Sequence, residues 1–409
     1  MKKIFALLVL LSMFFAVSAH AAQEPIKIGA MYALTGANAA IGTNILRGID
    51  FAVKMINAQG GVNGRMLEVV RGDTEGDAAK ARSVAEKLVT QDKVHAILGC
   101  HQSTLTNIAA QVCDANEIPM ITAISTVDNL SENGYEYFFR MCPMNSVYVR
   151  GMFDYLREQA KVTGKEVKKI AIFADNSNIG QEIIRCSEIF APEYGIEIVA
   201  KIEYQGGQPD MSSEVLALKN AAADAVIAES YINDATLLMR TLQEQNYQPP
   251  ILVAKANGYT DPTFLQNNPG ISNGVASVIE WNADLTKGRE INAEFKKEYG
   301  VDMNGHSAES FTATWILKTA FEAAGTSDGS AVKDAIKKLD IQEKFPNGPE
   351  IILPYNRIKF ENHTFSGKEH YNNNVFASIA IAQVQDGEYK TVWPLEYAGT
   401  KIAYPAQYK

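Results

Sequence analysis

Short runs rich in β-branched residues alternate with longer segments of helical period along most of this chain, and the alternation occurs twice. The first series begins with an apolar run at 26–34 and an amphipathic segment at 41–58, which stops at Gly60-Gly61. The second series begins with the apolar run at 170–174 and continues to about residue 253. Alternating strands and helices are typical of α/β proteins with parallel sheets. The pattern therefore predicts two doubly wound parallel-sheet lobes within one chain.

The segments after the second series predict how the lobes are connected. Several helical segments follow between Glu290 and Leu339, more than the second sheet needs to cover it. We therefore expect the chain to return to the first lobe there, and a last strand to lead back to the second. The lobes are then joined by three hinge crossovers, near Asn145, Trp281 and Val375.

These crossovers define the predicted domains. The first lobe comprises residues 22–143 plus 282–374, and the second comprises 144–281 plus 375–409. Within the first lobe, the stretch 347–374 is rich in Pro, Asn and Gly, which favours an irregular surface excursion.

The first 21 residues have the pattern of a secretory signal peptide. Lys2 and Lys3 precede an apolar run at 4–17, and the small-residue tripeptide Ala19-His20-Ala21 follows. The apolar run is shorter than the roughly 20 residues that span a bilayer. We expect cleavage to give a mature chain that begins near Ala22 and works in the periplasm.

Charge and cysteine content narrow the classes of function. The formal net charge of the 409 residues is −9, and removing the two signal lysines makes it −11, which argues against nucleic acid as a partner. The four cysteines permit at most one disulfide, with Cys100 or Cys113 joined to Cys142, or are small buried side chains, Cys186 among them. None stands beside the cleavage site to carry a lipid, so a soluble protein is expected.

Signs of catalysis or of a metal site are absent from the sequence. It contains no phosphate-binding glycine loop, nucleophile elbow or metalloprotease helix. His363 and His370 are close in sequence, but their spacing fits no zinc pattern, and solvated loop histidines are the better interpretation. We expect a protein that is not an enzyme and has neither cofactor nor metal.

Polar residues follow two neighbouring strands of the first lobe. A predicted strand at 96–99 leads into a turn with Gln102, and Ser103 falls at the start of the next helix. Unpaired N–H groups at such a helix end bind carboxylates, although an ordinary N-cap serine has the same spacing. The next strand is followed by Ile124, Ser125 and Thr126 at the same edge of the sheet. The two turns together predict a shared polar site.

The chain resembles the leucine/isoleucine/valine-binding proteins, the extracytoplasmic receptors of branched-chain amino acid ABC importers. The resemblance covers essentially the whole mature chain. It is carried by 26–36, 57–64, the turn at Ser103, 119–122 and 138–140. It implies the type I periplasmic binding fold, a membrane ABC permease as partner, and a monomeric protein that delivers an amino acid or similar small carboxylate to it.

The resemblance also implies a set of ligand-binding residues. In the family a serine and a threonine at the positions of Ser103 and Thr126 hold the α-carboxylate, and the backbone carbonyl at Ile124 contacts the ammonium. Gln102 stands beside Ser103 in this site. The family also has an aromatic side chain from the second lobe that covers the ligand, at the position of Tyr231.

Three further positions depart from the family. Ile41 and Ile179 stand where aromatic residues are usual, which reshapes the pocket. The glutamate that pairs with the ammonium falls at Asn257, and a neutral amide is a weak substitute for a buried anion. Either Glu229 replaces it or the ligand lacks an ammonium. Glu229 is equally well interpreted as a solvent-facing loop carboxylate.

Other functions stay open at this point. The Asn257 departure would permit aromatic or other non-amino carboxylates as ligands. An exported sensor that signals to a membrane kinase or chemoreceptor would have the same fold. A hydrolytic enzyme built on the scaffold is the least favoured reading.

Overall fold

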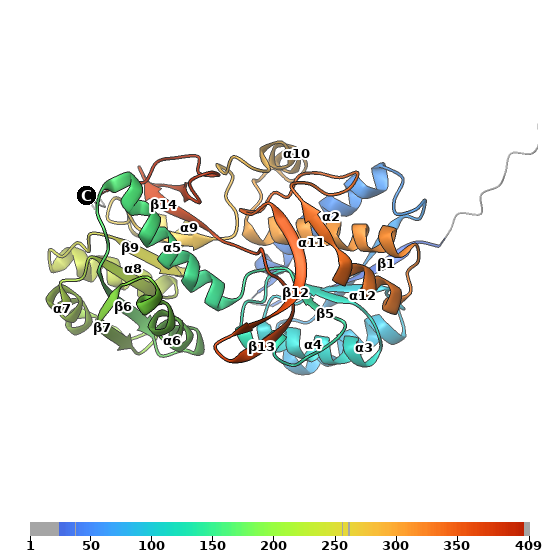
Figure 1. Ribbon diagram of the computed structural model, residues 1–409, viewed down its shortest axis with the longest axis horizontal. Helices are drawn as coiled ribbons and strands as arrows, with labels where there is room; N and C mark the ends of the chain where they lie inside the picture. The colour runs from blue at the N-terminus through green and yellow to red at the C-terminus, as the bar shows by residue number, and fades with distance from the viewer. Residues whose placement is uncertain (1–23, 37, 256, 261, 405–409) are drawn as a thin grey trace, which may run out of the picture.

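The computed structural model describes residues 24–404, apart from residues 37, 256 and 261, so the predicted signal peptide lies outside the described residues. Within them the strands form two sheets, one of eight strands and one of seven, each covered by helices. The two sheets and their helices lie side by side along the long axis of the molecule, as Figure 1 shows. We call the unit with the eight-stranded sheet lobe 1 and the other lobe 2.

Lobe 1 contains the first part of the chain and a later part. Its sheet has the strand order β11-β12-β13-β5-β4-β3-β1-β2. The strands are β1 (Ile26–Tyr32), β2 (Leu67–Asp73), β3 (Ala96–Gly99), β4 (Met120–Thr122), β5 (Phe138–Arg140), β11 (Asp340–Gln342), β12 (Arg357–Phe365) and β13 (Lys368–Asn374). The helices are α2 (Ala39–Ala58), α3 (Ala78–Thr90), α4 (Ser103–Ala115), the short 3-10 helix η1 (Asp128–Ser131), α10 (Arg289–Tyr299), α11 (Gly305–Ala324) and α12 (Gly329–Lys338).

Lobe 2 contains the middle of the chain and its last strands. Its sheet has the order β15-β14-β10-β9-β8-β6-β7. The strands are β6 (Lys169–Asp175), β7 (Glu197–Tyr204), β8 (Ala225–Glu229), β9 (Leu252–Lys255), β10 (Ala276–Ile279), β14 (Ala380–Gln385) and β15 (Glu388–Trp393). The helices are α5 (Asn145–Thr163), α6 (Asn178–Glu193), α7 (Ser212–Ala221), α8 (Ile232–Glu244), the short η2 (Asn257–Tyr259) and α9 (Pro262–Asn267).

The two lobes repeat one arrangement. Five parallel strands follow the same order in each, β2-β1-β3-β4-β5 in lobe 1 and β7-β6-β8-β9-β10 in lobe 2. This doubly wound order confirms the predicted fold class. The sheets are mixed rather than wholly parallel, because β11-β12 and β14-β15 add antiparallel strands at one edge of each. Ligands bind such sheets beyond the carboxyl ends of the parallel strands.

The chain passes between the two sheets three times. These passages connect β5 to α5, β10 to α10, and β13 to β14. Of the expected crossover points, Trp281 and Val375 lie in the second and third of these connections, and Asn145 is the first residue of α5, directly after the first connection.

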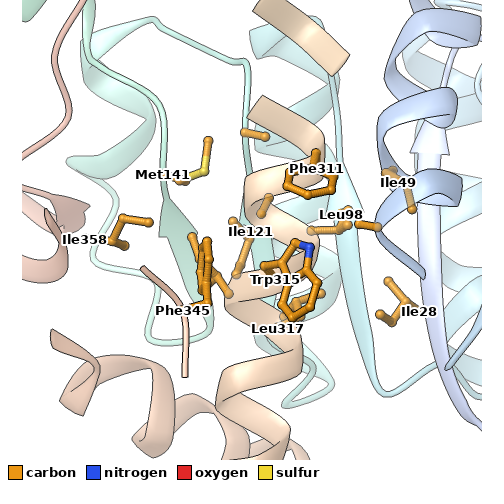
Figure 2. Close-up of a cluster of buried hydrophobic side chains, with 14 of the residues drawn as sticks. Ile28, Ile49, Leu98, Ile121, Met141, Phe311, Trp315, Leu317, Phe345 and Ile358 are labelled. Carbon is orange, nitrogen blue, oxygen red and sulfur yellow. The ribbon is translucent and has the colours of Figure 1, made fainter. Parts of the chain in front are cut away.

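Helix α11 forms the centre of the lobe 1 core. Every residue from Ser307 to Phe321 is buried, and the helix packs against α2, α12 and β3. Figure 2 shows its Phe311 and Trp315 beside Leu98 of the sheet. Buried threonines are tolerated in this helix because their hydroxyls donate to backbone carbonyls four residues earlier, as Thr312 does at 2.8 Å. The helix is therefore buried on almost every side although it carries many polar side chains.

The stretch 347–374 is more ordered than the sequence predicts. Strands β12 and β13 form a hairpin there, so the expectation of an irregular excursion is wrong for most of it. His363 and His370 pair across this hairpin with ring centroids 5.4 Å apart, and His370 is buried. The interpretation of solvated loop histidines is therefore also wrong. A strand of mostly polar residues shows no alternation of apolar and polar side chains, so the sequence pattern does not indicate a strand there.

The structure answers two further questions, whether the cysteines are paired and whether a helix could span a membrane. Cys100, Cys113, Cys142 and Cys186 are all buried and free, so they are the small buried side chains of the second alternative. In the part of the chain that the structure describes, no helix combines the length and the apolar character needed to cross a membrane.

Candidate functional site

The start of α4 carries the first of the two predicted polar turns. Ser103 is the first residue of the helix, and Gln102, at the N-cap position, makes no capping hydrogen bond with its side chain. Four N–H groups at a helix start have no partner within the helix, and aligned peptide dipoles make this end positive. The first turn of α4 can therefore donate to a carboxylate placed beside Ser103.

Ser125 links this turn to the next one. Its buried hydroxyl lies 3.0 Å from the carbonyl oxygen of Cys100 and 3.1 Å from that of His101, and it also bonds the Thr106 hydroxyl. Thr126 follows directly and is half-buried. The structure thus brings the turns at Ser103 and Thr126 together at one edge of the lobe 1 sheet.

A groove of about 1010 Å³ opens between the two lobes beside α4. Its walls come from the first turns of α4, from η1 and the residues around it, from the start of α6 in lobe 2, and from the tip of the β12–β13 hairpin. Of the residues predicted from the sequence, Ser103 and Ile179 line this groove, one from each lobe. Ser103 therefore faces the gap between the lobes.

The other predicted lobe 1 residues lie around this edge without lining the groove. Ile124 is buried just after β4. Ile41 lies in the first turn of α2 and packs against the lobe 1 core. The Gln102 side chain lies beside Gly76. Their contacts with a ligand stay predictions.

Tyr231 of lobe 2 is an exposed aromatic residue that does not line the groove. Tyr231 immediately precedes α8 and is 46% exposed, which is unusual for a large aromatic side chain. Burial and the neighbouring Glu229 raise its pKa. A side chain in this position is free to cover a ligand.

The structure describes the side chain of Glu229 but only the backbone of Asn257. Glu229 is wholly buried at the end of β8, so the reading as a solvent-facing loop carboxylate is wrong. Burial, reinforced by the charge of Asp175, raises the pKa of Glu229 to about 8. Its carboxyl is therefore mostly protonated at neutral pH and offers little charge to an ammonium. Asn257 begins η2, and only its backbone is described.

Sequence reasoning missed a buried lysine in lobe 2. Lys255 ends β9 directly opposite Glu229, donates a hydrogen bond to the side chain of Asn145, and stands 4.7 Å above the Tyr148 ring. Burial lowers its pKa, while the charge of Glu182 opposes that change. A single charged residue in an apolar strand gives no pattern that would identify it in advance.

Polar contacts also connect the lobes at the hinge. Asp128 of η1 accepts a hydrogen bond from the Ser146 backbone N–H at 3.1 Å, and Asn145 donates to Glu182 of α6. Arg185, one turn farther along α6, stands 3.8 Å from Asp128. Charged groups from both lobes thus meet where the chain first crosses between them.

The arrangement supports reversible binding of a small solute. Among the described residues, no group of three histidine, cysteine or acidic side chains is placed to hold a metal ion. Two doubly wound lobes with a groove between their strand ends, a free helix start on one and an exposed aromatic on the other, define a two-lobed solute-binding protein.

Sequence comparison identifies the family. Residues 25–387 match the model of the periplasmic binding protein family. The chain belongs to this family and within it to the group of the Leu/Ile/Val-binding proteins. It is 30% identical over 394 residues to Leu/Ile/Val-binding protein homolog 7 of Brucella suis biovar 1 (strain 1330), covering 94% of this chain and 95% of that protein. Homolog 8 of Brucella abortus (strain 2308) is also 30% identical, with 94% of each covered.

Solved structures show the same fold. The substrate-binding protein LivJ of a Streptococcus pneumoniae branched-chain amino acid transporter, in complex with isoleucine, matches with a TM-score of 0.69 at 23% identity, covering 90% of this chain and 99% of that one. A putative branched-chain amino acid ABC transporter protein from Silicibacter pomeroyi matches with a TM-score of 0.80 at 19% identity, covering 93% and 99%. These structures show the fold, and membership of the Leu/Ile/Val-binding protein group makes this chain a binding protein and not an enzyme.

Proposed function

We propose that this chain is the extracytoplasmic solute-binding protein of an ABC importer. It captures an amino acid of the branched-chain class, or a similar small carboxylate, in the cleft between its lobes and delivers it to a membrane permease. The names of its relatives as Leu/Ile/Val-binding protein homologues support this proposal. Cleavage of the signal peptide at 1–21 would place the monomeric mature protein in the periplasm.

The observation that carries the proposal is the free start of α4 at the mouth of the lobe 1 sheet. Ser103 lines the interlobe groove there without a side-chain cap on the helix, beside the turn that holds Thr126. In the proposed site Ser103 and Thr126 hold the ligand carboxylate, and the Ile124 carbonyl accepts from its amine. Hydrogen bonds to a charged carboxylate are among the stronger ones in proteins.

Closure of lobe 2 completes the site. The ligand binds first to lobe 1, and Tyr231 and Ile179 then cover it as the lobes rotate about the three crossovers. Ile41, Gln102 and the backbone around Asn257 border the enclosed space. The closed form presents the surface that the permease recognises, and no bond is made or broken in the ligand.

A thermal-shift screen of the purified mature protein tests the proposal. The panel contains amino acids, aromatic acids, short organic acids, sugars and amides. A ligand present at about 100 times its dissociation constant should stabilise the protein by about 2.7 kcal/mol. Shifts with free carboxylates support the proposal, whereas shifts confined to sugars or amides would remove it.

A further inference from the structure

The groove between the lobes has an acidic inner wall. Asp128 from lobe 1 and Glu182 from lobe 2 both line it, and their side chains are only 5% and 16% exposed. The two cations that line the same groove are far more exposed, Arg185 at 46% and Lys368 at 66%. The two carboxylates are therefore the most buried of these charges, whereas Lys368 is exposed and paired with Glu132 of the same groove.

Asp128 has a carboxylate oxygen without a hydrogen-bond partner, and the Arg185 guanidinium stands 3.8 Å from it. Its Oδ1 accepts from the Ser146 N–H, but its buried Oδ2 has no hydrogen-bond partner in the described structure. Buried polar atoms in folded proteins nearly always have a partner, and each exception asks for an explanation such as a bound water, ion or ligand. An acceptor at this place in a groove points to a donor that comes from outside the chain.

Glu182 faces Asp128 from the other lobe. Its Oε2 accepts from Asn145, and burial together with the charge of Asp128 raises its pKa. Two carboxylates held close in a poorly solvated place repel each other. Buried Arg140 of lobe 1 and Lys255 behind Asn145 in lobe 2 offset part of this repulsion, and Arg185 stands on the groove side of the pair. A ligand cation that takes the place of Arg185 between the two carboxylates would hold the lobes together.

Arg185 is placed as an exchangeable counter-ion for this pair. Its guanidinium stands 3.8 Å from Asp128 and 3.6 Å from Glu182, both beyond the length of a good hydrogen bond. Nearly half of its side chain is exposed. Such loose ion pairs contribute little to stability, so a ligand cation can take this place at low cost.

We propose that Asp128 and Glu182 form a cation subsite that binds the amine of the ligand, with one carboxylate from each lobe. This inference rests on the proposed function, since it assigns the negative charge that the neutral amide of Asn257 does not supply. It makes the ligand an amine-bearing carboxylate rather than a plain carboxylic acid. Lobe closure is then driven in part by the ammonium, which both lobes share.

Matched pairs of ligands test this subsite by isothermal titration. Each pair is an amino acid and the same acid without its amine: leucine with 4-methylpentanoate, phenylalanine with 3-phenylpropanoate, and 4-aminobutyrate with butanoate. For the wild-type protein the amine-bearing member of the binding pair should bind more tightly by roughly ten- to hundredfold. In Asp128→Asn the ratio of the two affinities should fall to about one.

The substitutions at residues 128 and 182 are chosen to keep the neighbouring hydrogen bonds. Asparagine at 128 retains an oxygen for the Ser146 N–H, and Glu182→Gln retains one for Asn145, so each removes charge while leaving a hydrogen bond. Glu182→Gln should also lose the preference, which keeps the test available if Asp128→Asn fails to fold. Glu132→Gln is the matched control, because Glu132 lines the same groove but pairs with Lys368 at 3.2 Å. It should leave the preference unchanged.

Two results would overturn the subsite and leave the carboxylate-binding function intact. One is equal or tighter binding of the acids without an amine. The other is an undiminished preference in both Asp128→Asn and Glu182→Gln. If no carboxylate in the panel binds the wild-type protein, the proposed function itself fails, and the subsite fails with it.

Discussion

Removal of the Ser103 hydroxyl at the start of α4 tests whether this residue binds the ligand carboxylate. Ser103→Ala removes one donor to a charged group and should weaken ligand binding by about 1.5 to 3 kcal/mol, or roughly tenfold to a hundredfold. The folded state should be unaffected, because the Ser103 side chain does not cap the helix. Titration calorimetry gives the affinity and thermal unfolding gives the stability. Ser83→Ala, at an exposed position on α3, is the control. Unchanged affinity in Ser103→Ala would exclude this residue from the site.

The buried carboxyl of Glu229 predicts a pH dependence of stability. Burial raises its pKa to about 8, so the folded chain binds this proton more tightly than the unfolded chain, whose carboxyl has the ordinary value of 4.5. The stability linked to it is present below about pH 4.5 and is lost as the pH rises toward 8. Glu229→Gln should therefore gain up to a few kcal/mol over the wild type across this range. Urea unfolding at several pH values measures the difference, and parallel curves for the two proteins would contradict it.

The residues in and around the proposed site were only partly predictable. The position of Ser103 followed from a strand end that leads into a helix start, a local pattern that the structure retains. Asp128 and Lys255 carry no such pattern, since each is a lone charge whose role depends on partners from distant segments. The environment of Glu229 was undecided for the same reason, because burial depends on how the β8 end is covered.

At the scale of elements, the β12–β13 hairpin ties lobe 1 to lobe 2. Its tip carries Phe365, which stacks on Phe190 of α6 with ring centroids 5.7 Å apart. In Figure 1 the hairpin tip reaches from beneath lobe 1 toward α6. We therefore expect the hairpin to limit how far the lobes open on this side of the groove.

Phe365→Ala should loosen the arrangement of the lobes. Loss of the ring stacking removes about 0.5–1.5 kcal/mol beyond the lost burial. Spin labels on Met66→Cys and Leu216→Cys, both exposed and on different lobes, would report a longer and broader distance distribution. Val301→Ala, an exposed substitution in lobe 1, should leave the distribution as it is. A distribution that is identical in Phe365→Ala would show that the hairpin does not restrain the lobes.

This hairpin also marks the limit of predicting elements from sequence. Strands with buried apolar residues, such as β3, are visible as short apolar runs. Strand β13 is polar, and its burial depends on amides: Asn372 donates to the carbonyl oxygens of Tyr135 and Phe138. Hydrophobic period does not report hydrogen-bonded amides, so the strand reads as a loop.

At the scale of the whole molecule, the fold does not depend on disulfides. The four cysteines are free and buried, and burial raises the pKa of each thiol, to about 12 for Cys186. The folded protein should therefore unfold at the same temperature with and without reductant. A thiol reagent should react only after denaturant is added. A clear loss of stability on reduction would show that a bridge forms.

The two-lobed architecture was predictable because it repeats a strong local signal. Alternation of strand and helix occurs twice, and surplus helices between Glu290 and Leu339 require a return to lobe 1. The last two strands, on either side of Asp386-Gly387, were predictable as short strand segments and form the β14–β15 hairpin. The antiparallel strands at the edge of lobe 1 and the interlobe contacts were not, since they arise from segments that meet only in the folded chain.

The central claim is that lobe 1 recognises a negatively charged head group at the start of α4. The most direct measurement compares the affinity for the amino acid found in the thermal-shift screen with that for its neutral carboxamide. The account predicts that the carboxamide binds at least about a hundredfold more weakly, because a charge-assisted contact is lost and a neutral group must replace it. Equal affinity for the two compounds would contradict the account.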